Sequence, residues 1–427
     1  MHPEPAPPSY RALFAIPDLG RIVLSMQLAR IAQSMVAVAL VLFTLAQFRS
    51  PELAGLVMFF SLFPGIVISP VAGALLDRHG RVRLIRLDYV VALVTMLLIG
   101  GLSLAGMLTP PLLILIATIS SLTAPFSQTG LRSLFPLMVP EHLWERINAF
   151  DSNGYLIASI VGPPAAAALA AFFGTQIAVL AIALPYALAA IALVGVREPV
   201  SRVVTTGRLL RDALDGLRYS WGNRTIRGLA FSIASLNVAG GIGTIVIPLL
   251  IVERLGGSEL LVGLVFALSG VAGMTSVFFF GRHDTRGREW PMLVYPMLLC
   301  VPVTALLLLA SGGVALTVPL LGLAAIGLSM TLWGLLAGPL DIALFTIRQR
   351  RTDPVWLGRA FAISMAFNFS GFPVGAALAG LLAARSLDVA ILAAVIACAV
   401  AGVFAAVLVP RREEPAPRRE EALGAGL

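Results

Sequence analysis

The sequence has no lysine and little charge of any kind. Its 30 basic residues are all arginine, and charged residues make up 12% of the 427-residue chain, against about 25% in an ordinary soluble domain. Hydrophobic residues make up 58%, and the mean hydropathy is +0.93. This shortage of charge excludes a soluble globular protein. Apolar runs of about 20 residues match the length that a helix needs to cross ~30 Å of hydrocarbon, and strand-like alternation is absent. The sequence therefore predicts an all-α membrane protein.

Cysteine and histidine are also scarce, which bears on metals and cofactors. The two cysteines, Cys300 and Cys398, each lie inside an apolar run, where helix packing is expected rather than a disulfide. The four histidines show no metal-ligand spacing, so neither a metal site nor a cofactor is expected. The formal net charge is +8, but the arginines stand in short segments between apolar runs. That placement indicates membrane topology, and no nucleic-acid partner is expected.

Twelve apolar runs are long enough to be transmembrane helices. They cover residues 22–47, 53–76, 87–108, 112–131, 147–173, 176–196, 228–251, 260–280, 291–310, 314–340, 358–383 and 387–409. Nearly all arginines lie in alternate connections and in the two tails. Because basic residues collect in cytoplasmic loops, both termini are predicted to be cytoplasmic. The proline-rich N-terminus lacks the cleavage site of a signal peptide and is predicted to remain as a cytoplasmic tail.

The longest connection divides the spans into six and six. The predicted organisation is a tail at 1–21, a six-helix bundle at 22–196, a linker at 197–227, a second six-helix bundle at 228–409 and a tail at 410–427. Within the linker, Leu210, Leu214, Leu217 and Trp221 recur at helical spacing. They predict an amphipathic helix at the cytoplasmic membrane surface. A solvated linker that happens to contain a few leucines is the alternative.

An internal repeat relates the two bundles. The residues Asp77–Arg81, with the pattern D-x-x-G-R, follow the second span, and Asp284–Arg288 repeat that pattern after the eighth. Pro163 in the fifth span has a counterpart in Pro373 in the eleventh, at nearly the same offset. Matches in corresponding segments favour two six-helix pseudo-repeats in parallel. The second copy is weaker, because Thr285 stands where the first copy has an arginine.

A charged segment between the second and third spans carries the most specific pattern. The pattern is G-x-L-x-D-R-x-G-R. We call its residues Gly73, Asp77, Arg78, Gly80 and Arg81 the gating motif. The pattern resembles the signature loop between helices 2 and 3 of major facilitator superfamily (MFS) transporters. Charge packed between two apolar spans belongs at a membrane surface, so a tight turn is expected there.

Two further stretches extend the resemblance over essentially the whole chain. Gly162 and Pro163 resemble the antiporter motif of MFS exporters, although Ala166 and Ala167 replace two glycines of the family pattern. The linker resembles that of macrolide-efflux and enterobactin-exporter relatives. The resemblance implies the MFS fold of twelve transmembrane helices. It also implies drug or siderophore export across the bacterial inner membrane by a monomer, with the proton gradient as its energy source.

The resemblance also assigns a role to the gating motif. Asp77 would face the N-terminus of helix 11 near Gly358 and so latch the two halves together. Arg81 would pair with a carboxylate, for which Asp151 at the start of the fifth span is a possible partner. The alternative is a cluster of charges that only fixes membrane topology. Arginine in the first half of helix 4, common in drug–proton antiporters, is absent from residues 112–123, so that proton-coupling role is not carried over.

Polar residues inside the spans are the candidates for contact with substrate. Gln27, Arg30 and Ser34 share one helical face of the first span, and Arg30 lies ~13 Å along it. A charge at that depth is expected to face the central cavity, where it would contact substrate or an acidic partner. The alternative is that Arg30 snorkels to the cytoplasmic surface. Three further candidates stand on other spans: Gln128, Tyr155 and Asn368. Glycines on the same faces could instead serve helix packing.

Asp151 and Asp341 are the candidates for proton coupling. Each lies near the end of a helix of the cavity-lining type, and removal from water favours the protonated form of a carboxylate. An exposed anion at the cytoplasmic surface is the alternative for both.

The sequence thus predicts secondary active export of small amphipathic molecules by alternating access. Uptake of a small solute by the same fold is the first alternative, and only Gly162–Pro163 argues against it. A polytopic membrane enzyme would need a constellation of His, Cys or acidic residues inside the membrane, and the spans show none. A channel would not need the two-half repeat.

Overall fold

The computed structural model describes residues 10–198, 217–282, 286–312, 318–353 and 356–411. Throughout these ranges the regular elements are helices, and twelve of them are long and apolar enough to cross a membrane. The elements are α1 (Tyr10–Phe14), α2 (Leu19–Phe48), α3 (Pro51–His79), α4 (Arg81–Leu104), α5 (Pro110–Met138), η1 (Glu141–Leu143), α6 (Trp144–Phe173), α7 (Thr175–Ala192), α9 (Arg224–Pro248), η2 (Leu249–Arg254), α10 (Glu259–Phe280), α11 (Glu289–Ala305), α12 (Leu307–Ser311), α14 (Pro319–Arg350), α15 (Leu357–Ala383) and α16 (Leu387–Leu408). The predicted all-α fold with twelve membrane spans is confirmed.

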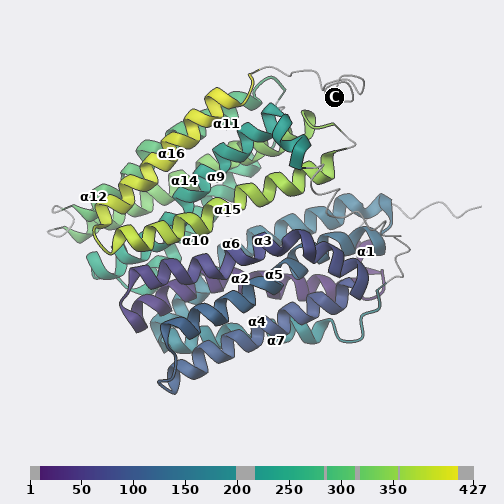
Figure 1. Ribbon diagram of the computed structural model, residues 1–427, viewed down its shortest axis with the longest axis horizontal. Coiled ribbons are helices and arrows are strands. Elements are labelled where there is room, and N and C mark those ends of the chain that lie inside the picture. The colour runs from purple at the N-terminus through teal and green to yellow at the C-terminus, as the bar shows by residue number, and fades with distance from the viewer. Residues whose placement is uncertain (1–9, 199–216, 283–285, 313–317, 354–355, 412–427) are drawn as a thin grey trace, which may run out of the picture. The chain divides into compact units, whose positions relative to one another are not determined.

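Two compact units make up the chain. Unit 1 contains residues 1–207, 244–270 and 376–387, and unit 2 contains residues 208–243, 271–375 and 388–427. In unit 1, α2 packs against α6 and α7, α3 packs against α5, and α4 lies between α5 and α7 (Figure 1). In unit 2, α11 and α12 pack against α14. The residue boundaries of the two predicted bundles remain a prediction.

The connection between α3 and α4 is shorter than the sequence suggests. Helix α3 continues to His79, α4 begins at Arg81, and Gly80 alone stands outside a helix. Its φ of +87° lies in a region that side chains with a Cβ avoid, which explains why a glycine occupies this position. The expected charged loop is therefore a one-residue turn, and the arginines of residues 81–86 belong to the first two turns of α4.

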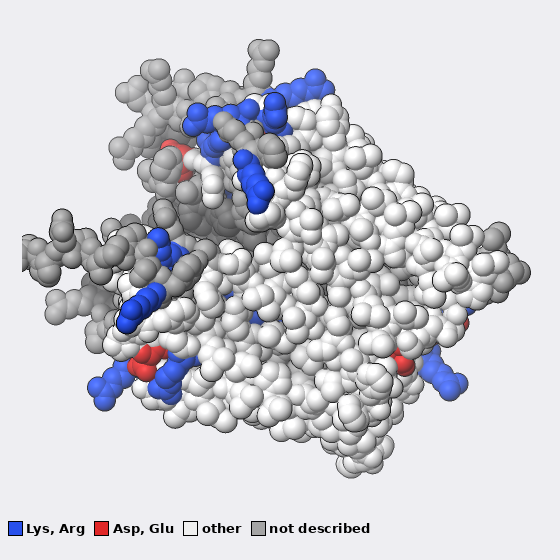
Figure 2. All heavy atoms as spheres, turned by 180° about the vertical axis from the view of Figure 1, so that it is seen from behind, with Lys and Arg blue, Asp and Glu red and all other residues white. Residues whose placement is uncertain are grey.

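Charged residues occupy only a small part of the molecular surface, as their low share of the sequence leads one to expect. In Figure 2 most of the visible surface is uncharged, and the described Arg, Asp and Glu residues gather mainly toward its margins. Large apolar side chains are exposed along the spans, including Phe172, Leu184 and Ile396 at 73%, 62% and 62% of their surface. An apolar surface of this kind suits contact with lipid tails, which are themselves apolar.

Two smaller predictions concern the cysteines and the linker. Cys300 on α11 and Cys398 on α16 are buried free thiols, in keeping with a packing role. Of the predicted amphipathic helix, Leu210 and Leu214 lie outside the described residues. Residues 217–222 are helical, and Trp221 is 53% exposed.

Candidate functional site

An ion pair between α2 and α6 lies at the centre of the candidate site. Arg30 Nη2 lies 2.5 Å from Asp151 Oδ1, and Nη1 of the same guanidinium donates to the backbone oxygen of Asp151 at 2.6 Å. Arg30 is 6% exposed and Asp151 is 9% exposed. Arg30 is thus buried against an acidic partner, and its guanidinium does not snorkel to the surface. Its contact with substrate remains a prediction.

Tyr155 and Arg132 complete a cluster around this pair. The guanidinium carbon of Arg30 lies 3.7 Å from the centre of the Tyr155 ring, a cation–π contact, and that of Arg132 lies 5.4 Å from it. Arg132 Nε lies 3.9 Å from Asp151 Oδ2. The side chain of Arg132 is 56% exposed and Tyr155 is 40% exposed. The cluster therefore combines a buried pair with an accessible cation and an accessible aromatic ring.

Glycines on α6 let α2 approach closely enough to place the remaining residues. A Cβ added at Gly154 would lie 2.8 Å from Arg30 Nη1, and one added at Gly162 would lie 2.6 Å from Ser34 Cβ. Both distances are below normal contact. At Gly162 the neighbours are Ser34 Cβ and the backbone N of Met35, so a glycine is needed there, whereas at Gly154 they are the ends of the Gln27 and Arg30 side chains. Gln27 lies in the same interface, and its buried Oε1 has no hydrogen-bond partner. The structure thus brings together Gln27, Arg30 and Ser34 with the polar face of α6.

The expected pairing of Arg81 with Asp151 is wrong. Arg81 Nη1 lies 3.2 Å from Glu198 Oε1, and its Nε donates to Ser133 Oγ at 3.0 Å. Glu198 Oε2 also accepts from the backbone N–H of Val82 at 3.2 Å. A carboxylate is favoured there because the N-terminus of α4 carries unpaired N–H groups and partial positive charge. Asp151 is instead bound by Arg30.

The other residues of the gating motif are only partly described. Arg78 is exposed at the end of α3. An added Cβ at Gly73 would meet nothing within 4 Å, so close packing does not require a glycine there. The side chain of Asp77 and those of residues 357–362, where its expected helix-11 partner lies, are outside the described residues. Asp284 of the second copy is outside them as well.

The candidates of unit 2 lie in a different environment. Asn368 on α15 is 3% exposed, and its backbone oxygen accepts from Asn237 Nδ2 at 2.8 Å. In the amide orientation that satisfies its neighbours, Asn368 accepts from Arg348 Nη2 at 2.8 Å and donates to the backbone oxygen of Ser364 at 3.0 Å. Asn368 therefore makes well-defined contacts inside unit 2. Asp341, on α14 of the same unit, is exposed. Gln128, on α5 of unit 1, is exposed as well.

Sequence reasoning did not single out Asp88, a buried acid on α4. It is 3% exposed, and its Oδ1 accepts from Thr123 Oγ1 on α5 at 2.7 Å. Asp88 stands ~10 Å along α4 from Arg81, at 1.5 Å per residue. The signal was present in the sequence as an acid at the start of an apolar run. Hydropathy starts that span at residue 87, which places Asp88 at the membrane surface and hides its burial.

Comparison with known proteins identifies the family. Residues 22–354 match the family model described as Major Facilitator Superfamily. The chain is 36% identical over 385 residues to an uncharacterized MFS-type transporter, y4rN, of Sinorhizobium fredii, a match that covers 89% of this chain and 92% of that one.

Solved structures agree at the level of the fold. A D-xylose–proton symporter superposes with a TM-score of 0.71 at 15% identity, over 95% of this chain and 99% of that one. A bacterial homologue of the human lysosomal transporter Spinster, in an inward-facing and unoccupied conformation, gives 0.71 at 14% identity with the same coverage. At such identities the likeness shows the fold alone. On the family match and the close relative, this chain belongs to the major facilitator superfamily and is a multi-pass secondary transporter, not an enzyme.

Proposed function

We propose that this transporter exports small amphipathic molecules (drugs, antibiotics or siderophore-like metabolites) in exchange for protons, by alternating access. The observation that carries the proposal is the cluster of Arg30, Asp151 and Tyr155 inside unit 1. A buried charge in a membrane-spanning helix is expensive and is usually retained for function. The pair satisfies both charges, and the accessible Tyr155 and Arg132 leave a surface that a solute can reach.

The chemistry of this cluster favours an amphipathic solute. The 40% exposed ring of Tyr155 offers an apolar face, while Arg132 offers a cation that is 56% exposed. A neutral or partly anionic molecule with an apolar body would match these groups, since aromatic rings provide apolar area and arginine binds carboxylates.

The direction of transport rests on Gly162 and Pro163. Both are buried in α6, and Gly162 packs directly against Ser34 on α2. Their likeness to the antiporter motif supports export over uptake. The branch of drug, macrolide and enterobactin exporters is proposed on the same likeness. Uptake of a small solute is the second candidate, because a D-xylose–proton symporter shares the fold.

Placement in the membrane follows from the arginine distribution. The family resemblance supports a place in the bacterial inner membrane as a monomer. Both termini then lie in the cytoplasm, because arginines favour the cytoplasmic side. The gating motif then lies at the cytoplasmic end of α3. There Asp77 would latch the halves, while Arg81 holds the start of α4 through Glu198.

Proton coupling is proposed from the acids of the spans. Asp151 would exchange a proton when Arg30 turns from it to a substrate carboxylate, because a buried carboxylate that loses its partner favours protonation. Asp341 is the candidate in unit 2. It stands nine residues before Arg350, the last residue of α14, and the residue is exposed. At ~13 Å from the helix end, an exposed acid is expected to face a water-filled path.

The test is a panel of toxic compounds applied to an efflux-deficient bacterial strain, with and without the protein. Export predicts higher tolerance to at least one amphipathic compound, and loss of that tolerance in Arg30→Ala. Glu253→Gln is the matched control, because Glu253 is an exposed acid away from the cluster. Greater sensitivity on expression would indicate uptake and contradict export. Unchanged tolerance to every compound, with the protein present in the membrane, would also count against the proposal.

A further inference from the structure

Asp88 is held in a polar environment inside the helix bundle of unit 1. Helix α4 carries it, and α5 faces it with Thr123 and Ser127. In the described part of the chain its carboxylate makes no ion pair. A buried charge without a counter-ion costs several kcal/mol, and the cost disappears when the group is neutral. Two hydroxyl groups beside it can accept from a protonated carboxyl or donate to an ionised one.

Polar side chains continue from Asp88 across the bundle. Ser127 stands one helical turn after Thr123 on α5, and Gln33 Nε2 on α2 donates to Ser127 Oγ at 3.4 Å. Gln33 in turn is three residues after Arg30, so both side chains lie on neighbouring positions of one helix face. Hydrogen bonds thus join Asp88 on α4 to Thr123 on α5, and Ser127 on α5 to Gln33 on α2. Gln33 stands one turn from Arg30, whose guanidinium binds Asp151 on α6.

The other ionisable groups near Asp88 are few. On its own helix the neighbouring Tyr89 is buried, and its ring lies 6.5 Å from that of Tyr186, the tyrosine of α7. Helix α7 contains no charged residue, and the one charge of α5 is Arg132, which lies beside Asp151. Helix α3 carries charge only at its two ends. Two buried arginines of unit 1, Arg30 on α2 and Arg81 on the helix of Asp88, are bound to Asp151 and Glu198.

We propose that Asp88 is a proton-binding site, connected through Thr123, Ser127 and Gln33 to the Arg30–Asp151 pair. In the ionised state its carboxylate accepts from the Thr123 hydroxyl, whose Oγ1 lies 2.7 Å from Asp88 Oδ1. Addition of one proton from water makes the carboxyl neutral and gives it an O–H that donates to a neighbouring hydroxyl. Ser127 and Thr123 then reorient, which changes the hydrogen bond that Gln33 makes one turn from Arg30. Loss of the same proton to water restores the first state.

The proposal rests on proton-coupled transport as the proposed function, and it names a carrier that differs from both Asp151 and Asp341. Asp151 is neutralised by an arginine, and Asp341 is exposed. Asp88 alone among these three is both buried and without a cation in contact. That combination favours reversible protonation with little charge left in the membrane interior.

The test is infrared difference spectroscopy on the full-length protein in lipid vesicles, without substrate, between acidic and alkaline pH. The wild type is expected to show a protonated-carboxyl band at acidic pH that disappears at alkaline pH. This band is lost in Asp88→Asn and shifted in Thr123→Val, because the carboxyl loses a hydrogen-bond partner. Asp388→Asn is the matched control and keeps the band, since Asp388 stands at the start of α16 and binds Ser311.

A difference spectrum for Asp88→Asn that equals the wild type overturns the proposal. If Asp88→Asn does not fold, Thr123→Val is used in its place. A difference spectrum of Thr123→Val that equals the wild type then also overturns the proposal. A second measurement separates this inference from the proposed function. If a pH gradient does not change the transport of a compound from the panel, proton-coupled export is wrong. If the Asp88 band still changes with pH in that case, the proposal of a proton-binding site is supported.

Discussion

Arg30 Nη2 and Asp151 Oδ1 lie 2.5 Å apart between α2 and α6, and both side chains are buried. Removing one partner of a buried ion pair leaves an uncompensated charge, which costs about 3–5 kcal/mol. Replacing both by apolar residues is often neutral for stability. The pair can therefore be tested for a role in stability and a role in transport separately.

Arg30→Met is expected to lower the unfolding temperature of the purified protein, and the double variant Arg30→Met with Asp151→Leu is expected to recover most of that loss. Transport is expected to stay abolished in both variants, because neither can bind a solute through Arg30. Unfolding is followed by the fluorescence of a thiol dye in detergent, and transport by drug tolerance. Recovery of transport in the double variant would show that the pair only holds the helices together.

The contact of Gly162 with Ser34 provides a second test. A Cβ added at Gly162 would lie 2.6 Å from Ser34 Cβ, so Gly162→Ala is expected to push α6 from α2 and to destabilise by about 1–3 kcal/mol. Adding Ser34→Gly removes the closest clash and is expected to restore part of the stability, because the backbone N of Met35 stays 3.1 Å from the added Cβ and glycine weakens α2. Unfolding of the single and double variants is compared with that of Gly73→Ala, where an added Cβ meets nothing within 4 Å. A stable Gly162→Ala protein would contradict the packing seen in the structure.

Glu198→Gln tests the ion pair that holds the start of α4. The substitution keeps the shape of the side chain but removes the charge that Arg81 and the N-terminus of α4 both contact. A loss of about 1–2 kcal/mol is expected, since bonds to charged groups contribute about that much and the pair is only partly exposed. High salt should reduce the difference from wild type in part. Equal stabilities of Glu198→Gln and wild type at low salt would show that the charge of Glu198 does not stabilise the start of α4.

Asp77→Asn addresses the gating motif. If Asp77 latches the two halves, transport is expected to fall while the amount of protein in the membrane stays unchanged. The measurement is drug tolerance together with quantification of the protein in isolated membranes. If Asp77 only helps to set topology, transport should be normal whenever insertion is normal. Arg83→Gln is the control, because Arg83 lies in the same charged segment outside the gating motif.

The sequence was sufficient for the spans because apolar runs of this length have one common outcome in a membrane. It also indicated the right face of α2 and of α6, since helical spacing places Arg30 beside Gln27 and Ser34, and Asp151 beside Tyr155. Which acid pairs with which arginine could not be read in this way. Arg81 and Glu198 are far apart in sequence, and their contact depends on how α4, α5 and the segment after α7 meet.

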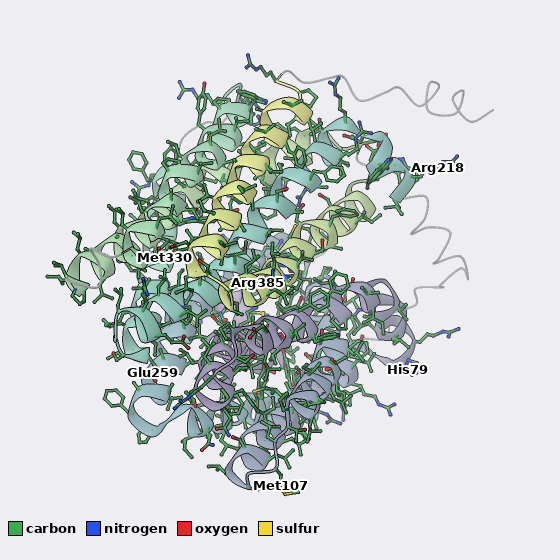
Figure 3. All side chains as sticks on the ribbon, turned by 60° about the vertical axis from the view of Figure 1, so that its left-hand side comes forward. His79, Met107, Arg218, Glu259, Met330 and Arg385 are labelled. Atoms are coloured by element: carbon green, nitrogen blue, oxygen red, sulfur yellow. The ribbon has the colours of Figure 1, made fainter. Side chains whose placement is uncertain are left out.

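Asp88 shows a different limit. Hydropathy fixes the existence of a span more firmly than its ends, and an acid near an end can be assigned either to the surface or to the interior. Because α4 begins at Arg81, Asp88 lies two turns inside the helix and is buried. Figure 3 shows His79, just before α4, and Met107, just after it, well apart on unit 1. The whole length between them is helix except for Gly80 and the turn after Leu104.

Proton-driven export through the Arg30–Asp151 cluster is tested most directly in vesicles that contain only this protein. A fluorescent amphiphile identified by the compound panel is supplied outside inside-out vesicles, and a pH gradient, acidic inside, is imposed. The account predicts accumulation of the amphiphile that requires the gradient and is lost in Arg30→Ala but kept in Glu253→Gln. Accumulation of the same size without a gradient, or in Arg30→Ala, would contradict it.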